Sequence, residues 1–372
     1  MPANCQHELT LNQETKVTQA PLRAVVIGAG IGGLSATLRL AHAGLAVTVI
    51  DMAPAPGGKM RTRASVAGPV DIGPTVMTLK PVFEALFADV GARLSDHVAL
   101  IPETVLARHF WRDGATLDLG NDADRNAAAI RAFGGDAAER QFRRFCARAA
   151  RLYAAFEGPM LHAPEPRLTG LTAHVLKNPD LIPAMAPGRS LASSLASQFS
   201  DPRLRQLFGR YATYVGGSPY KSPAVLGLIW HSEASGVWRV AGGMHKLATA
   251  MQKLAQDKGA QFRFGTRAVR IEQQDGRVTA VHLEDGSRLA ADLVVFNGDP
   301  KALVEGHLGN GPRKAVPVAG VAARSLSAFV WGFAAEPVGV DLAHHNVFFC
   351  ADPKREFADL AAGRMPTDGT LY

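Results

Sequence analysis

The sequence predicts an α/β fold in which a buried parallel sheet is interrupted along the chain by a helix-rich insertion. Two observations predict the sheet: residues 23–51 read as strand, glycine-rich turn, helix and strand, and strand-like runs return after residue 236. Between these two parts, the composition and hydrophobic spacing of residues 122–206 are typical of helices. Strands far apart in sequence can join one sheet, so we expect a single sheet assembled from two parts of the chain.

The first turn of this unit carries three glycines at a characteristic spacing. The apolar run 24–27 is typical of a strand buried on both faces, and Gly28, Gly30 and Gly33 follow it in the order G-x-G-x-x-G. Gly28 permits a tight turn, Gly30 lets the backbone approach a pyrophosphate, and Gly33 lets the next helix pack closely against the sheet. The pattern predicts a Rossmann-type dinucleotide site with the phosphates on the helix N-terminus.

The residues after the turn support this interpretation. A helix is expected at residues 32–43, ended by Gly44, and a second strand at 46–50. Asp51 closes that strand 23 residues after Gly28, near the offset at which a carboxylate binds the ribose hydroxyls. The alternative is a glycine turn without a ligand in an ordinary α/β protein, and the acid at the strand end argues against it.

The loop at residues 52–62 offers a second phosphate contact. Its glycines expose backbone N–H groups and its basic residues supply charge, so Gly58, Lys59 and Arg61 are candidate binding residues. The alternative is a surface loop with incidental cations. Further on, Gly73-Pro74 interrupts an apolar run that can lay its backbone along a flat ring system.

Composition limits the class of protein. The chain has 372 residues, 47% of them hydrophobic and 20% charged, which is ordinary for a globular protein of two domains. Its three cysteines, Cys5, Cys146 and Cys350, form neither a disulfide framework nor a zinc pattern, so we expect no metal and a reducing compartment. No run is long and apolar enough to span a membrane, and residues 1–21 read as a polar, flexible leader without a signal peptide core.

The remaining elements follow from turn residues and hydrophobic spacing. We expect a helix at 81–90, a hairpin at 105–119 around Asp113-Gly114, a strand at 237–240, a helix at 244–258, and strands at 261–264, 268–273, 277–283 and 291–299. In the insertion, apolar residues repeat at helical spacing as Leu191, Leu195 and Phe199, and as Leu204, Leu207, Phe208 and Tyr211.

These elements predict five parts of the chain. After the leader, residues 22–85 form the first part of the nucleotide-binding domain and 86–235 a helix-rich substrate domain facing a membrane. Residues 236–300 return to the nucleotide-binding domain, and 301–372 continue the substrate domain.

Several motifs together resemble those of a known family. GAGIGGL, PGGKMRT, DIGPT, WRVAGGMHKLATAM, TRAVRI and ADLVVFNGD stand in the order and spacing of the FAD-dependent amine-oxidase-like flavoproteins, and within them of the bacterial carotenoid desaturases. VAGPVDIGPTVMTL, LARHFWRDG, YVGGSPYKSPAVLGLIWHSEASGVWRVAGGM and HHNVFFC are similar to the hydroxyneurosporene or methoxyneurosporene dehydrogenases among them. The resemblance covers nearly everything from Leu22 to Tyr372.

The resemblance implies FAD as the bound cofactor and a Rossmann-type FAD-binding domain with an inserted α+β substrate domain. It places the pyrophosphate on Gly28, Gly30 and Gly33, the adenosine ribose on Asp51, the second phosphate side on Lys59 and Arg61, and the adenine on the backbone of Val269. It also places Gly73-Pro74 and Gly242-Gly243 near the isoalloxazine. Members of the family carry a second flavin motif beyond the point where this chain stops, so we expect an incomplete sequence.

Three functions are then open. The resemblance favours a flavin-dependent 1-hydroxycarotenoid 3,4-desaturase of carotenoid synthesis in photosynthetic bacteria. The alternatives are another flavin enzyme of the fold, such as a phytoene desaturase, polyene isomerase or amine oxidase, and a non-catalytic prenyl- or nucleotide-binding relative. A base is formally needed to remove a proton, and His109, Glu157, His231 and Glu233 are available, but the sequence selects none of them.

The expected partners are a hydrophobic carotenoid and a membrane surface, with no nucleic acid. The net charge of +7 suits anionic head groups, and we expect the apolar stripes of residues 122–220 to dip into the bilayer or to pack against one another. This predicts a cytoplasmic protein held peripherally at the inner membrane. The electron acceptor stays open between quinone and oxygen.

Overall fold

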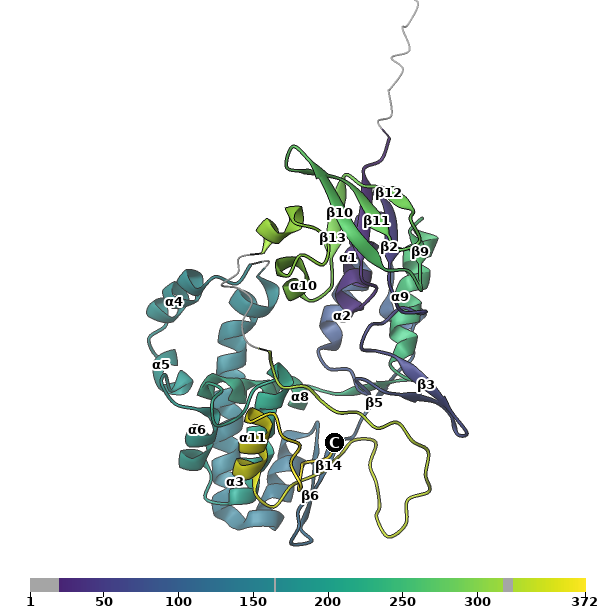
Figure 1. The fold of residues 1–372 in the computed structure, drawn as a ribbon. Coiled ribbons are helices and arrows are strands. Elements are labelled where there is room, and N and C mark those ends of the chain that lie inside the picture. Colours follow the sequence, from purple (N-terminus) through teal and green to yellow (C-terminus); the bar gives the residue numbers. More distant parts are fainter. Residues whose placement is uncertain (1–19, 164, 317–323) are drawn as a thin grey trace, which may run out of the picture.

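The chain folds into two lobes. The computed structural model describes residues 20–163, 165–316 and 324–372, so the expected leader lies almost entirely outside the described residues. One lobe holds the parallel sheet, and the other holds most of the helices (Figure 1). An antiparallel pair, β5 (Leu100–Pro102) and β8 (Trp238–Val240), links them.

The central sheet is assembled from two parts of the chain that the helix-rich insertion separates, as the sequence predicts. Its four strands are parallel and run in the order β13 (Leu293–Phe296), β1 (Arg23–Ile27), β2 (Ala46–Ile50) and β9 (Gln261–Arg263). In β1, Val26 pairs with Val49 of β2 on one side and with Val295 of β13 on the other. The insertion therefore separates the halves of one sheet in sequence without separating them in space.

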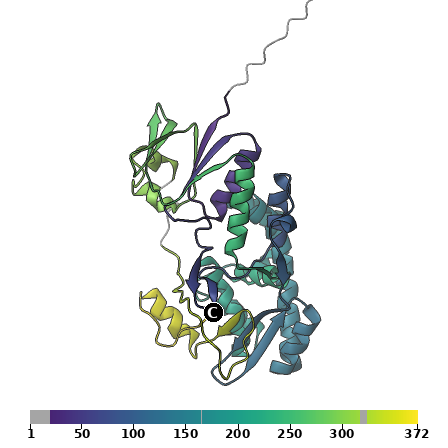
Figure 2. The same cartoon turned by 90° about the vertical axis from the view of Figure 1, so that its right-hand side faces the viewer.

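Both faces of this sheet are covered, which explains its run of β-branched residues. On one face, Val26 and Val49 pack with α1 (Ile31–His42) and α9 (His245–Asp257), which lie side by side (Figure 2). On the other face, Val25 and Ile50 pack against a second, antiparallel sheet. That sheet consists of β10 (Ala268–Gln274), β11 (Arg277–Leu283) and β12 (Arg288–Ala290).

Smaller elements complete the first lobe. A hairpin of β3 (Thr62–Ser65) and β4 (Gly68–Asp71) leads to α2 (Lys80–Asp89) and η1 (Leu94–Asp96). Near the other end of the lobe lie α10 (Pro300–Val304) and η5 (Gly311–Ala315). The sequence predicts that the first part of the nucleotide-binding domain ends at residue 85, and that boundary stays a prediction. Leu94 and Val98, which lie beyond it, pack in the same core as β1.

The second lobe surrounds a three-stranded sheet in the order β14 (Asn346–Phe348), β6 (Val105–Phe110) and β7 (Thr116–Gly120). The long helix α3 (Ala123–Phe156) kinks at Gly135, where φ is 82°. The other elements are η2 (Glu157–His162), a π-helical turn, and α4 (Leu168–Lys177), α5 (Leu181–Met185), α6 (Leu191–Gln198), α7 (Pro202–Gly209), η3 (Arg210–Val215), η4 (Ala224–Leu228), α8 (Ile229–Ala234) and α11 (Pro353–Ala361).

The apolar stripes of the insertion are core, so of the two expected arrangements they pack against one another and do not face a bilayer. Their members are at most 1% exposed and form one cluster with Trp230 and Phe142: Leu191, Leu195, Phe199, Leu204, Leu207, Phe208 and Tyr211. Amphipathic spacing predicts which side of a helix is buried but not what buries it.

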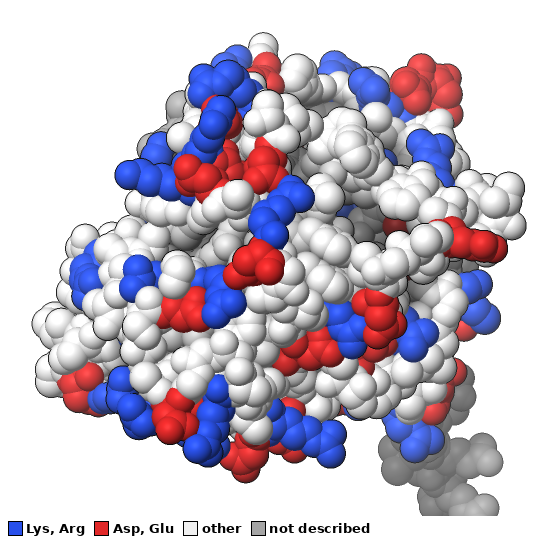
Figure 3. Space-filling model, turned by 90° about the horizontal axis from the view of Figure 1, so that it is seen from below, with Lys and Arg blue, Asp and Glu red and all other residues white. Residues whose placement is uncertain are grey.

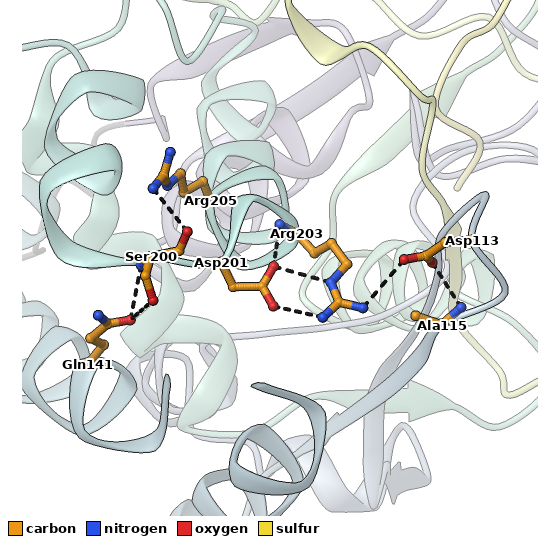
Figure 4. Close-up of polar contacts among 7 residues, drawn as sticks. All are labelled: Asp113, Ala115, Gln141, Ser200, Asp201, Arg203 and Arg205. Atoms are coloured by element: carbon orange, nitrogen blue, oxygen red, sulfur yellow. Dashed lines mark hydrogen bonds and ion pairs between the residues drawn. The ribbon is translucent and has the colours of Figure 1, made fainter. Parts of the chain in front are cut away.

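A polar network ties the β6–β7 turn to α7 (Figure 4). Asp201 accepts the Arg203 backbone N–H as the N-cap of α7, and its Oδ2 lies 2.8 Å from the Arg203 guanidinium. The same guanidinium reaches Asp113 in the turn at 3.4 Å. Nearby, the Gln141 side chain of α3 accepts the Ser200 backbone N–H at 3.1 Å. The β6–β7 turn, α3, α7 and the segment before α7 are thereby held together.

Charges of both signs are interspersed on the face seen in Figure 3. The net positive charge of the chain is therefore not gathered into a single patch on that face, where Lys and Arg side chains alternate with Asp and Glu.

Candidate flavin site

The glycine turn lies at the carboxyl end of β1 and opens α1. The Gly28 N–H donates to Ile50 O, and its φ of 105° is one that glycine adopts easily. A Cβ on Gly33 would lie 1.9 Å from Gly28 O, so no side chain fits there. The N-cap residue of α1, Gly30, has no side-chain cap, and the first turn of the helix carries no acid. The N-terminus of α1 therefore has no side-chain cap and no acid of its own, and it is suited to an external anion.

Asp51 fastens this turn to the loop that follows β2. One carboxylate oxygen accepts the Ala29 N–H at 2.7 Å and the other accepts the Ala53 N–H at 2.8 Å. Each oxygen keeps a second lone pair, so the half-buried carboxylate can still accept ribose hydroxyls. Asp51 thus has a structural task that the sequence did not reveal, beside the binding role predicted for it.

The loop at residues 52–62 packs directly on the glycine turn. The Gly57 N–H donates to Ala29 O at 2.8 Å, and a Cβ on Gly58 would lie 3.1 Å from the Gly30 Cα. The His245 imidazole at the start of α9 lies 3.0 Å from Pro56 O and pins the loop from the other side. The two glycine segments predicted to contact phosphates therefore lie side by side.

The two basic residues of this loop are both exposed. Lys59 lies directly after Gly58, while Arg61 lines an open groove of about 400 Å³. The groove is also lined by Arg63, Ile72, Ala328, Val330 and Gly332. Arg61 thus lies at a hollow beside the loop rather than within the glycine turn.

Val269 lies at a bulge at the start of β10. Ala268 pairs with Leu283, and Arg270 pairs with the adjacent residue of β11, His282. Val269, which lies between Ala268 and Arg270, therefore has no partner in the ladder. A bulge leaves backbone groups of the extra residue free to bind a ligand. The segment before it is fixed beside Asp51, because the Thr266 N–H donates to Asp51 O at 3.1 Å. Val269 is therefore brought to the same end of the site as Asp51.

The two segments expected near a flavin ring also meet. A Cβ on Gly73 would lie 1.8 Å from Lys59 O, so Gly73-Pro74 runs against the phosphate loop. Asp71, at the end of β4, accepts the Met244 N–H at 2.8 Å and thereby holds the Gly242-Gly243 turn. Asp71 stands two residues before Gly73 and its carboxylate lies against Gly243, so it connects the two segments.

Asn297 is a residue of the site that sequence reasoning missed. It follows β13, and its side-chain amide donates to Gly28 O at 3.3 Å. Its Oδ1 lies 2.6 Å from where a Cβ on Gly32 would stand. The available signal was its place directly after a buried strand, since the carboxyl ends of parallel strands share one edge.

A second polar cluster lies buried in the helix-rich lobe. The Arg210 guanidinium of η3 lies 2.6 Å from Glu233 Oε1 of α8, and the two side chains are 2% and 5% exposed. The hydroxyls of Tyr211 and Tyr214 also donate to the Glu233 carboxylate. This cluster fixes η3 on α8, whose chain continues through β8 into the Gly242-Gly243 turn.

Burial and the Arg210 charge keep nearby histidines neutral. Burial, and after it the Arg210 charge, lower the pKa of His345 to about 4, and the opposing effect of Glu233 is smaller. The same two causes hold the pKa of buried His109 well below its usual value. Both imidazoles are therefore neutral near pH 7.

This predicts acid sensitivity below neutral pH. An unfolded histidine titrates near 6.5, so between pH 6.5 and 4 the unfolded chain binds more protons than folded His345 and stability falls as pH falls. From pH 7 to pH 5 the loss from His345 is about 1–2 kcal/mol. Urea unfolding of His345→Gln at both pH values should show a pH dependence smaller by that amount; an unchanged dependence would contradict the account.

The structure explains why no catalytic base is assigned. Glu233 is engaged by Arg210, and His109 is fully buried with Nδ1 3.0 Å from Leu117 O. Glu157 accepts from the Tyr153 hydroxyl at 3.3 Å, and the His231 ring lies against Tyr153 with centroids 5.0 Å apart. All four side chains thus have structural partners.

The residues present fit a dinucleotide-type cofactor. Glycines occur where a Cβ would meet backbone, the N-terminus of α1 is uncapped, and the Asp51 carboxylate lies beside the glycine turn. The described residues contain no group of three or more His, Cys, Asp or Glu that could hold a metal ion.

Comparison with known proteins identifies the family of the chain. The family model for flavin containing amine oxidoreductases matches residues 31–323. The chain is 54% identical to hydroxyneurosporene desaturase of Cereibacter sphaeroides and 51% identical to that of Rhodobacter capsulatus, covering 94% of this chain and 71% and 70% of those proteins. Phytoene dehydrogenase of Streptomyces griseus is 33% identical, over 93% of this chain and 67% of that protein.

A solved structure supports the fold alone. Putrescine oxidase superposes with a TM-score of 0.54 at 16% identity, covering 78% of this chain and 60% of that one. The chain thus spans about seven tenths of the two hydroxyneurosporene desaturases and six tenths of this structural neighbour. The match over most of the chain and the identity to curated desaturases show that the chain belongs to the flavin containing amine oxidoreductase family and, within it, to the carotenoid desaturases.

Proposed function

We propose that the protein is an FAD-dependent desaturase that introduces the C-3,4 double bond into a 1-hydroxy- or methoxycarotenoid such as hydroxyneurosporene. The observation that carries the proposal is the difference in identity: 54% and 51% to hydroxyneurosporene desaturases, against 33% to a phytoene dehydrogenase over a similar span. Nothing in the site favours the phytoene, isomerase, amine oxidase or non-catalytic alternatives.

Binding of FAD follows from the roles proposed for the residues of the site. The N-terminus of α1 with Gly28, Gly30 and Gly33 would hold the diphosphate, Asp51 the ribose, and the Val269 backbone the adenine. Gly58 and Lys59 would contact the diphosphate from the other side, with Arg61 contributing charge from the neighbouring groove. Flavin released from the purified protein should be FAD; recovery of FMN would overturn this assignment.

The chemistry divides between the cofactor and the chain. When bound, the flavin supplies the two-electron acceptor that removal of two hydrogens from adjacent carbons requires, which no side chain supplies. The residues described above bind and orient it. An allylic hydride can leave because the remaining positive charge is delocalised along the polyene, and loss of a proton from the neighbouring carbon completes the double bond.

The test is a carotenoid analysis. A host that makes only the 1-hydroxylated precursor is given the gene for the complete protein or a cofactor-site variant, Gly33→Ala. The intact gene should yield a product with two hydrogens fewer, and the variant should leave the precursor unchanged. Desaturation of phytoene with no change to the hydroxylated precursor would select the alternative desaturase.

We also propose peripheral contact with a membrane through the helix-rich lobe. The proposed carotenoid substrate is a long hydrocarbon of very low aqueous solubility, so the protein would have to take it from a bilayer. No helix among the described residues is long and apolar enough to cross a bilayer. Although the stripes named above are buried, the segment from η2 to α5 exposes other apolar side chains, namely Met160, Leu161, Leu168, Leu176 and Ile182. Exposed Arg167 and Lys177 flank α4 and can meet anionic head groups.

Flotation with liposomes tests this contact. The wild-type protein should float with anionic vesicles, and Leu168→Ser/Leu176→Ser should reduce the bound fraction, because both side chains belong to α4, which has no buried residue. The control is Val66→Ser, which removes an exposed apolar side chain from the β3–β4 turn of the other lobe. Equal flotation of the α4 double variant and the control would reject α4 as the contact.

A further inference from the structure

Asn297 forms one wall of the glycine turn that opens α1. Its backbone N–H donates to Ile27 O at 2.8 Å, and its side-chain Nδ2 donates to Gly28 O at 3.3 Å. A Cβ on Gly30 would lie 3.2 Å from Nδ2, and a Cβ on Gly33 would lie 3.0 Å from the same atom. The carboxamide therefore lies against the turn that is proposed to hold the diphosphate.

Gly32 stands outside the G-x-G-x-x-G spacing, yet its lack of a side chain has a reason. It lies in the first turn of α1 and does not have a positive φ, so the backbone itself would accept an alanine, which favours a helix. A Cβ on Gly32 would lie 2.6 Å from Asn297 Oδ1, and the three atoms nearest to it all belong to the Asn297 carboxamide. Gly32 thus leaves room for Asn297.

The Asn297 carboxamide has one end in use and one end open. Because Nδ2 donates to Gly28 O, the other end of the amide, Oδ1, is the acceptor that is left over. Oδ1 accepts no hydrogen bond from the described residues, and it is not among the unpartnered side-chain atoms that the protein seals from solvent. The residue as a whole is half-buried. Oδ1 is therefore accessible to a ligand that brings its own donor.

The order of the strands places Asn297 on one side of the turn and Asp51 on the other. The neighbouring parallel strands β13, β1 and β2 end, in that order, at Asn297, at the glycine turn and at Asp51. If the adenosine lies at Asp51 and the diphosphate at the turn, the rest of the cofactor continues on the Asn297 side. In FAD the part that follows the diphosphate there is the polyhydroxyl ribityl chain.

We propose that Asn297 is a positioning residue of the cofactor site: Nδ2 holds the glycine turn through Gly28 O, and Oδ1 accepts a hydrogen bond from a ribityl hydroxyl of the flavin. This rests on the proposed FAD binding. A hydroxyl is a donor that an amide oxygen binds well, and a carboxamide held from its other end is already oriented for that contact. Gly32 allows the carboxamide to take this position.

Gly32→Ala displaces the carboxamide without removing it. The new methyl group would overlap Oδ1, which is the end of a short side chain and can turn away while the backbone stays in place. We expect the dissociation constant for FAD to rise about tenfold, and the apoprotein to unfold at the same or a slightly higher urea concentration. The control is Gly170→Ala in α4, where a Cβ meets nothing within 4 Å and FAD affinity should stay unchanged.

A double variant tests whether the two residues act as a pair. Asn297→Ala should weaken FAD binding by about tenfold or more, and adding Gly32→Ala to it should cause no further loss, because the group that the methyl displaces is gone. Losses that add in the double variant would show that Gly32 acts independently of Asn297 and would overturn the inference.

ADP separates a contact with the ribityl chain from a general effect on the turn, because it carries the adenosine and the diphosphate but no ribityl hydroxyl. Asn297→Ala should weaken binding of FAD by about fivefold or more beyond its effect on ADP. Equal weakening of FAD and ADP overturns the ribityl contact, and equal FAD binding by Asn297→Ala and wild type overturns the positioning role as well. Failure of wild type to bind FAD at all would instead overturn the proposed function.

Discussion

Replacing Glu233 by alanine is expected to lower the free energy of unfolding by about 3–5 kcal/mol, because it leaves the Arg210 guanidinium buried without a counter-charge. The hydroxyl of Tyr211, 3.0 Å from Glu233 Oε1, loses its acceptor as well. The Arg210 Nε is already buried and has no hydrogen-bond partner among the described residues. The measurement is urea unfolding at pH 7.

Two comparisons make this result specific to the buried charge. Asp257→Ala breaks an exposed pair with Lys253, whose side chains are 54% and 74% exposed, and should cost about 0.5 kcal/mol or less. A double variant, Arg210→Leu/Glu233→Leu, leaves no charge behind and should be less destabilised than Glu233→Ala. A loss for Glu233→Ala no larger than that for Asp257→Ala would show that the cluster does not hold the lobe together.

Gly33→Ala is expected to abolish flavin retention and to destabilise the first lobe by about 1–3 kcal/mol. The added Cβ would stand 1.9 Å from Gly28 O, so the turn or the start of α1 must move. Either movement displaces the backbone that is proposed to hold the diphosphate. Flavin bound per chain and the urea midpoint measure the two effects separately.

The matched control is the same substitution in another helix. A Cβ on Gly170 of α4 meets nothing within 4 Å, so Gly170→Ala should keep its flavin and gain about 0.5–1 kcal/mol from helix propensity. If Gly33→Ala binds as much flavin as Gly170→Ala, the glycine turn is not the cofactor site.

The fold was predictable because its signals are local. Structure is specified within a few residues by the apolar run 24–27, by the three glycines and by the strand at 46–50. The sequence of β13 is apolar and β-branched like that of β1. The two halves of the sheet could therefore be matched from the sequence, and they pair in the structure.

The site was predictable only in part because its missing members act across long distances in the chain. Asn297 contacts Gly28 over 269 positions, and Asp71 contacts Met244 over 173, and no periodicity links such pairs. Arg210 and Glu233 are buried charges from two different elements, η3 and α8, and hydrophobic spacing reports only apolar residues. For the same reason, helical spacing predicted that Leu204 and Leu207 share one face of a helix but did not predict what that face packs against.

Anaerobic mixing of the FAD-loaded protein with a 1-hydroxycarotenoid in liposomes tests the central claim most directly. The account predicts that the visible absorption of the oxidised flavin bleaches as the carotenoid gains a double bond, in equal molar amounts, since each desaturation delivers two electrons to one flavin. Phytoene serves as the comparison substrate and dithionite as the control that the flavin can be reduced. A flavin that dithionite bleaches but the hydroxycarotenoid leaves oxidised would contradict the account.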